Sequence, residues 1–187
     1  MGKIGVILAR FQPVHNGHIA LIKKATEEND IVYIFIGSAD KFNERTPIPI
    51  SLRSEMLREA LKEHNLASKC EVRWLDDLTN ESDNSHDWGF YLFSTVVTET
   101  RSPYFTIYYS DGFEIITSWF PAFLLKNNVS LSLLARNSVE SGVSATQVRE
   151  LIMKNDDSLK DVVPAGVYER RTGIKQLIEL SKLKKHK

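Results

Sequence analysis

The sequence has almost no cysteine and no excess of charge of either sign. Cys70 is the single cysteine, which excludes disulfide pairing and a multi-cysteine zinc site within the chain and fits a reducing cytoplasm. The 24 basic and 24 acidic residues leave a formal net charge of zero. This argues against a nucleic-acid polymer as the main partner, because such binding needs a strongly basic surface. It does not argue against a nucleotide, which needs only a few local positive groups.

Long apolar runs are also missing. No stretch is long enough to span a bilayer, and the N-terminus leads directly into a strand-like segment rather than a signal peptide. We therefore expect a cytoplasmic protein with no membrane partner. The 187 residues, 42% of them hydrophobic, suit one globular domain over residues 1–187. The basic end, residues 182–187, is typical of a solvated tail.

Five apolar runs alternate with helical patterns. The strand-like runs cover residues 4–8, 31–36, 70–75, 105–109 and 129–134, and the helical patterns cover residues 19–28, 52–61, 88–98, 112–120, 145–153 and 173–185. This alternation predicts an α/β fold: a Rossmann-like, doubly wound parallel sheet of five strands, with helices on both faces and a helical C-terminal extension over residues 165–187. Ser51 is the expected N-cap of the second helix, and the acidic stretch 76–87 is expected to be a surface loop.

The string Arg-Phe-Gln-Pro-Val-His-Asn-Gly-His follows the first apolar run and precedes the first helical pattern. It places His15 and His18 where a strand leads into a helix, which is where an open parallel sheet binds phosphate. A helix N-terminus offers unpaired N–H groups and the positive end of its dipole. Gly17 lets the backbone approach a ligand, and the two imidazoles add donors for the same anion.

A second group, Gly-Val-Ser-Ala-Thr-Gln-Val-Arg at residues 142–149, follows the fifth apolar run and opens another helical pattern. Ser144 or Thr146 can cap this helix, and Arg149 lies about one turn further on, so its guanidinium can reach the same end. Taken alone, this pattern is also that of an ordinary capped helix with an exposed arginine. Together, the two groups can hold a triphosphate from two sides.

The first string resembles the HxGH signature of the nucleotidyltransferase superfamily. The longer string from Ala9 to His18 is similar to nicotinamide mononucleotide (NMN) adenylyltransferases of the archaeal type and to their Nudix-fused bacterial relatives. The second group resembles the superfamily's ISSTxxR or ISGTxxR signature, with Val143 in place of Ile and Ala145 where Gly or Ser is common. The family usually has Gly where this chain has Ala9, and the effect of this difference is open.

The resemblance implies roles for further residues. The segment Gly-Ser-Ala-Asp-Lys at residues 37–41 is similar to a loop beside the nucleotide, and residues 46–53 resemble a segment whose arginine meets the NMN phosphate. The implied ATP-binding residues are Arg10, Phe11, Gly17, Lys41, Ser144, Thr146 and Arg149, with His15, His18 and Arg149 as the catalytic residues. The implied mononucleotide-binding residues are Ser38, Arg53, Trp88 as a stacking platform and Asp111 at a ribose, and Arg136 is a weaker candidate. Trp74 and Trp119 are expected in the core or at an interface.

By resemblance, the expected reaction is transfer of AMP from ATP to NMN or its nicotinate analogue, giving the dinucleotide and pyrophosphate. Mg²⁺ would be held by the phosphates, since the sequence shows no carboxylate cluster that would cage a metal ion. Pantetheine-phosphate adenylyltransferases and cytidylyltransferases share the superfamily, so the donor, ATP or CTP, stays open. A catalytically silent nucleotide sensor, a structural protein on this fold and a homo-oligomer are further open alternatives.

Overall fold

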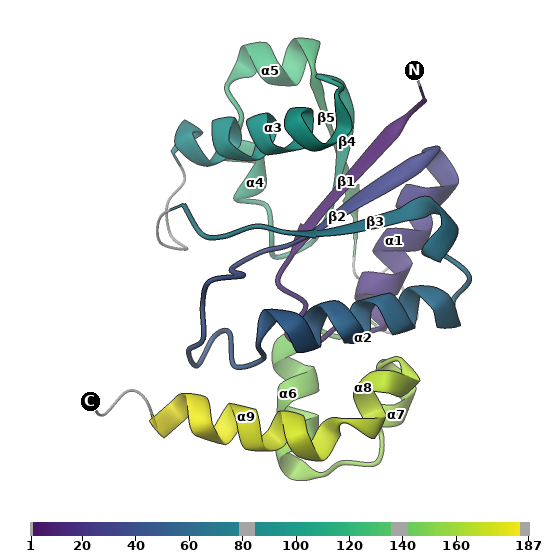
Figure 1. Ribbon diagram of the computed structural model, residues 1–187, viewed down its shortest axis with the longest axis vertical. Coiled ribbons are helices and arrows are strands. Elements are labelled where there is room, and N and C mark those ends of the chain that lie inside the picture. The colour runs from purple at the N-terminus through teal and green to yellow at the C-terminus, as the bar shows by residue number, and fades with distance from the viewer. Residues whose placement is uncertain (1, 79–84, 136–141, 184–187) are drawn as a thin grey trace.

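The computed structural model describes residues 2–78, 85–135 and 142–183. Its five strands are β1 (Ile4–Ala9), β2 (Ile31–Ile36), β3 (Cys70–Trp74), β4 (Phe105–Ser110) and β5 (Val129–Leu134). All neighbouring strands pair in parallel, in the order β3-β2-β1-β4-β5 (Figure 1). The predicted Rossmann-like doubly wound sheet is therefore confirmed. The strand order reverses at β1, whose neighbours are β2 and β4.

Helices cover both faces of this sheet. They are α1 (Asn16–Glu28), α2 (Ile50–Glu63), α3 (His86–Thr100), α4 (Ile116–Trp119), α5 (Ala122–Asn127), α6 (Ala145–Lys154), α7 (Leu159–Val162), α8 (Ala165–Glu169) and α9 (Arg171–Leu183), with a 3₁₀ turn at Ala67–Lys69. The helices α1, α2 and α6–α9 pack into one core, and α3–α5 pack into a second core on the opposite face. Figure 1 shows α6–α9 as an additional layer beside α2. Within the described residues, no helix combines the length and apolarity needed to cross a membrane.

The central strands are apolar on both faces, which accounts for their almost uninterrupted hydrophobic sequences. Ile7 of β1 faces the core under α1 and α2, whereas Val6 and Leu8 face the core under α3. In β2, Ile34 faces the core under α1 and α2, and Phe35 faces the core under α3. Side chains of successive strand residues point to opposite faces, so a sheet covered on both sides needs apolar residues at nearly every position.

Several element boundaries differ from the sequence prediction. The expected N-cap Ser51 is wrong, because α2 begins at Ile50 with Pro49 in the cap position. Only Ile116–Trp119 of the expected helix 112–120 is α-helical, and α3 begins within the stretch that was expected to be a loop. The helices α5 and α7 were not predicted, since six and four residues are too few to show a helical period. Helix α8 lies within the helical extension predicted over residues 165–187 but was not predicted as a separate helix. Residues 79–84 and 184–187 lie outside the described residues.

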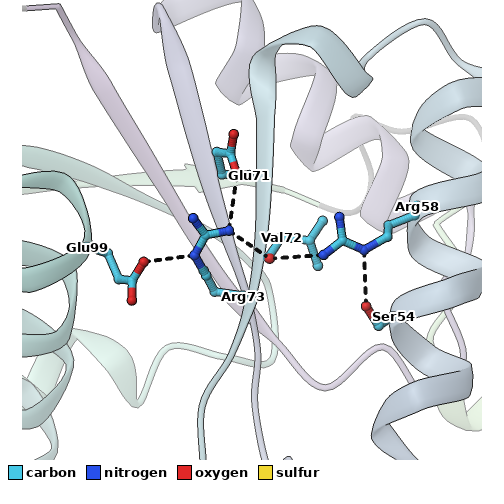
Figure 2. A network of polar contacts seen from close by, with 6 residues as sticks. All are labelled: Ser54, Arg58, Glu71, Val72, Arg73 and Glu99. Carbon is cyan, nitrogen blue, oxygen red and sulfur yellow. Dashed lines mark hydrogen bonds and ion pairs between the residues drawn. The ribbon is translucent and has the colours of Figure 1, made fainter.

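Side chains from both helical layers cover the open edge at β3. Arg58 of α2 and Arg73 of β3 both donate to the carbonyl oxygen of Val72, at 3.3 and 3.2 Å (Figure 2). Arg73 also reaches across to Glu99 of α3, with its Nε 2.8 Å from Oε2. These contacts occupy an edge carbonyl that would otherwise be available to pair with another strand.

Candidate active site

A cavity of about 510 Å³ lies at the carboxyl edge of the sheet. Every strand contributes a residue at or just after its end: Ala9, Gly37, Leu75, Ser110 and Leu134. The cavity therefore spans the point where the strand order reverses, which is where open α/β sheets bind ligands.

The first wall of the cavity is the N-terminus of α1. His15 is the N-cap, with extended backbone, and His18 lies in the first turn. Their ring centroids are 3.8 Å apart, and Phe11 packs against His18 with centroids 4.6 Å apart. The backbone N–H of His15 donates to Nδ1 of His18 at 3.3 Å, so a neutral His18 carries its proton on Nε2. All three side chains line the cavity.

The second wall is the N-terminus of α6. Ser144 caps this helix, accepting a hydrogen bond from the backbone N–H of Gln147 at 3.3 Å, while Oε1 of Gln147 accepts from the N–H of Ser144 at 2.8 Å. This reciprocal capping box confirms Ser144, rather than Thr146, as the cap. Thr146 instead accepts a hydrogen bond from Nη2 of Arg149 at 3.4 Å.

The two walls are in direct contact although they are far apart in sequence. Nη1 of Arg149 donates to the carbonyl oxygen of Gln12 at 2.9 Å. A Cβ on Gly17 would lie 3.3 Å from the carbonyl oxygen of Val143 and 3.1 Å from the ring of His15, so glycine permits this close packing. Residues from both groups line the same cavity: His15, Gly17, His18, Ser144, Thr146 and Arg149.

Charge is divided unevenly around the cavity. Arg10, Arg45 and Arg149 contribute positive charge, whereas Asp76 and Asp77 line the cavity after β3. Burial, together with the positive charge of Arg10, lowers the pKa of Arg149. The cavity can therefore bind a polyanion, because it combines two helix N-termini, two imidazoles and three guanidiniums.

Aromatic side chains of α3, of α4 and of the segment before α4 form a third wall of the cavity. Trp88 and Trp119 stack with centroids 5.2 Å apart and planes at 19°, and Phe113 meets Trp119 edge-on at 5.6 Å. All three line the cavity. Gly89 permits this arrangement, because a Cβ there would overlap the carbonyl oxygen of Trp119. A flat ring can stack on such a surface.

Three of the predicted site residues, Arg53, Lys41 and Asp111, are not among the residues that line the cavity. Arg53 is fully buried, and its guanidinium donates to three backbone carbonyl oxygens, so contact between Arg53 and a substrate phosphate stays a prediction. Nζ of Lys41 lies 2.7 Å from Oδ2 of Asp40, and neither Lys41 nor Asp111 is among the cavity-lining residues. Ser38 does line the cavity and donates to Oδ1 of Asp77 at 2.9 Å. Arg136 lies outside the described residues.

Sequence reasoning missed part of the lining. Arg45, Asp76 and Asp77 sit in irregular segments, where no periodicity indicates the direction of a side chain. The sequence predicts Trp74 and Trp119 in the core or at an interface. Trp119 is buried but also faces the cavity, whereas Trp74 is 62% exposed and not in the core. Among residues 2–78, 85–135 and 142–183, no group of three or more His, Cys, Asp or Glu side chains has the arrangement needed to hold a metal ion.

Known proteins share both the sequence and the fold. Residues 6–151 match the family described as Cytidylyltransferase-like. A nicotinamide-nucleotide adenylyltransferase of Thermococcus kodakarensis is 34% identical over 175 residues, covering 90% of this chain and 82% of the relative. The enzyme of that name from Picrophilus torridus is 28% identical over 178 residues, covering 94% and 95%.

A solved structure with the same fold is a bifunctional NMN adenylyltransferase/ADP ribose pyrophosphatase from Francisella tularensis, complexed with AMP and a manganese ion. Its TM-score is 0.70 at 19% identity, and the match covers 97% of this chain and 52% of that protein. The likeness to this structure concerns the fold, whereas the sequence relatives extend over nearly the whole chain. The chain belongs to the cytidylyltransferase-like family and, within it, to the nicotinamide-nucleotide adenylyltransferases.

Proposed function

We propose that the protein transfers AMP from ATP to nicotinamide mononucleotide, forming NAD and pyrophosphate. The observation that carries this proposal is the meeting of the α1 and α6 N-termini, with His15, His18 and Arg149, at one cavity. ATP carries its negative charge along a chain of three phosphates, and a site with donors on two sides can hold that chain along its length. The names of the sequence relatives support the choice of acceptor.

The chemistry requires little beyond positioning and charge stabilisation. The 5′-phosphate of the acceptor is already an anion at neutral pH, so it attacks the α-phosphorus of ATP without a general base. A bond forms from this phosphate oxygen to the α-phosphorus, and the bond from the α-phosphorus to the bridging oxygen breaks, releasing pyrophosphate. His15 and His18 stabilise the α-phosphate, and Arg10, Arg149 and the N-terminus of α6 stabilise the leaving group.

The acceptor occupies the remainder of the cavity. Arg45 binds its phosphate in place of Arg53, because Arg45 lines the cavity and Arg53 does not. The nicotinamide ring stacks on the wall of Trp88 and Trp119, and the carboxylates of Asp76 and Asp77 favour its positive charge. The same carboxylates disfavour the negative carboxylate of the nicotinate analogue.

Magnesium enters this reaction with ATP. Mg²⁺ prefers oxygen ligands and keeps several waters, so the triphosphate itself supplies the ligands that the ion needs. The cavity offers the carboxylates of Asp76 and Asp77 rather than a cage of ligands, which fits an ion carried by the nucleotide. When bound, the ion neutralises charge on the phosphates.

The test is incubation of the purified protein with magnesium, either ATP or CTP, and each of three acceptors: NMN, nicotinate mononucleotide and phosphopantetheine. Identification of products by mass is expected to give NAD from ATP and NMN. A product with CTP or phosphopantetheine only would assign the chain to another activity of the superfamily. ATP binding without pyrophosphate release would indicate a nucleotide sensor, and failure to bind any nucleotide would indicate a structural role.

A further inference from the structure

Arg53 is a buried arginine that joins two loops of the cavity. It is fully buried, and it extends from the first turn of α2 to the loops that follow β1 and β2. Its Nη1 donates to the carbonyl oxygens of Arg10 at 3.0 Å and Gly37 at 2.7 Å, and its Nη2 donates to that of Ser38 at 2.9 Å. One planar group therefore holds the backbone of both loops.

The loops that it holds have unusual backbone conformations. Phe11 and Ser38 both have φ of 51°, in the left-handed region that side chains other than glycine rarely adopt. The carbonyl of Arg10 belongs to the peptide preceding Phe11, and the carbonyls of Gly37 and Ser38 flank Ser38 on either side. The guanidinium therefore bonds next to both strained residues, where it can stabilise them.

The position of Arg53 is itself braced by the first loop. The side-chain amide of Gln12 accepts a hydrogen bond from the N–H of Ile48 at 2.9 Å and donates to its carbonyl at 3.1 Å, just before α2 begins. The carbonyl of Gln12 in turn accepts from Arg149. Hydrogen bonds thus link α2 to both strand-end loops through Arg53, and they link the first of these loops to α6 through Arg149.

A contribution to folding stability does not by itself explain why an arginine occupies this buried position. It forms no ion pair with a carboxylate in the part of the chain that the structure describes, and its Nε is buried with no hydrogen-bond partner there. Burial, followed by the nearby charge of Arg10, lowers the pKa of Arg53 to about 10, so it stays protonated at neutral pH. A buried cation without a carboxylate partner is costly to fold around.

We propose that Arg53 is a positioning residue for adenylyl transfer: it holds the loops after β1 and β2 in the conformation that presents Arg10 and Ser38 to the nucleotides. This proposal rests on the proposed function. It gives Arg53 the role of positioning the two loops instead of the role of binding the acceptor phosphate directly. Lysine keeps the charge at this position but not the planar fork that spans two loops. Arg53→Lys is therefore the informative substitution.

Arg58 supplies a matched control. It lies on the same helix, and its guanidinium also donates to a backbone carbonyl, but that carbonyl belongs to Val72 on the sheet edge away from the cavity (Figure 2). The same substitution, Arg58→Lys, changes the same kind of contact outside the site. Both variants are compared with the wild type well below their melting temperatures.

The experiment measures amide hydrogen exchange without ligand and steady-state kinetics with ATP and NMN. Arg53→Lys is expected to accelerate exchange at residues 10–12 and 37–39 together and to lower kcat/KM by about tenfold or more, the scale of misplaced catalytic donors. Arg58→Lys is expected to leave both quantities unchanged. Unchanged loop exchange or unchanged kcat/KM in folded Arg53→Lys overturns the proposal, and so does an equal loss of activity in Arg58→Lys.

Two further readouts separate the possible failures. If the wild type makes no dinucleotide, the proposed function fails, while the exchange comparison still decides whether Arg53 holds both loops. If Arg53→Lys does not fold, nuclear magnetic resonance of the wild type tests the geometry. Scalar couplings across hydrogen bonds, from the guanidinium nitrogens to the carbonyl carbons of both loops, support the proposal, and couplings to one loop only overturn it.

Discussion

Arg149 donates a hydrogen bond from Nη1 to the carbonyl oxygen of Gln12, which lies 137 residues earlier in the chain, at 2.9 Å. This contact joins the helix start after β5 to the loop after β1. The guanidinium of Arg149 and the paired imidazoles of His15 and His18 line one cavity. The proposed reaction depends on this convergence.

Replacing Arg149 by alanine is expected to lower kcat by about 10²-fold, the usual scale for losing one preorganised donor to the developing charge. Pyrophosphate release in a coupled assay measures this change. Arg171 of α9 is a suitable control, because its guanidinium lies over the ring of Tyr168 and outside the cavity. Equal losses in Arg149→Ala and Arg171→Ala would contradict a specific role for Arg149.

His18→Ala is also expected to lower kcat by about 10²-fold or more. Since Nδ1 of His18 accepts from the backbone of His15, the group that can donate to a ligand is Nε2. Glutamine can place a donor near the position of Nε2 and asparagine near that of Nδ1, so His18→Gln should retain more activity than His18→Asn. Unchanged turnover in His18→Ala would exclude the role.

The aromatic wall predicts a spectroscopic signal. Binding of NMN is expected to quench the fluorescence of Trp88 and Trp119, because a cationic ring stacked on the wall lies against their π faces. Titration of Trp88→Phe with NMN should show weaker quenching of the fluorescence. Steady-state kinetics of the same variant should show a higher KM for NMN. Trp74→Phe removes an exposed tryptophan outside the cavity and should leave the quenching unchanged. Loss of quenching in Trp74→Phe alone would place the acceptor elsewhere.

Asp76 is expected to contribute to the choice between the two acceptors. Burial, followed by the charges of Asp76, Asp40 and Asp77, raises the pKa of Tyr91, whose ring lies 5.8 Å from that of Trp88. This negative charge should favour NMN over nicotinate mononucleotide. Asp76→Asn should reduce the ratio of kcat/KM for NMN to kcat/KM for nicotinate mononucleotide several-fold, which is the scale of a modest charge interaction near the protein surface. An unchanged ratio would exclude Asp76 as a determinant.

Tyr108 predicts a loss of stability in alkali. Its hydroxyl donates to Glu28 at 2.7 Å and accepts from Asn29 at 2.8 Å, and burial, followed by the Glu28 bond, raises its pKa to about 12. Its stabilising contribution is fully present below the ordinary pKa of about 10 and is lost as pH rises through 12, because the unfolded state ionises first. Chemical denaturation of the wild type and Tyr108→Phe between pH 9 and 12 measures this. Tyr108→Phe should have a lower free energy of unfolding than the wild type at neutral pH. Between pH 9 and 12, its free energy of unfolding should fall by about 2 kcal/mol less than that of the wild type. Parallel curves for the two proteins would contradict the assignment.

The features that the sequence predicts are those that depend on local patterns of residues. The strands β1 to β5 and the start of α6 at Ser144 follow from apolar runs and a capping residue, which act over a few neighbouring positions. The convergence at His18 and Arg149 followed from a general property of doubly wound sheets, whose ligand site lies at the carboxyl ends of the strands.

Features that the sequence does not indicate arise where long-range packing decides the outcome. The direction of the Arg53 side chain depends on carbonyls of two other loops, which no local pattern indicates. The cavity wall at Trp119 depends on the close approach of α3 and α4 at Gly89, which no local pattern indicates. Arg45 lies in a segment without regular structure, where neighbouring residues do not determine side-chain direction.

A crystal structure with an ATP analogue that cannot be cleaved between the α and β phosphates tests the central claim most directly. The expected result is a triphosphate between the N-termini of α1 and α6, with His18 at the α-phosphate and Arg149 at the β- or γ-phosphate. A nucleotide bound outside this cavity, or phosphates that contact only one of the two helix starts, would contradict the shared site.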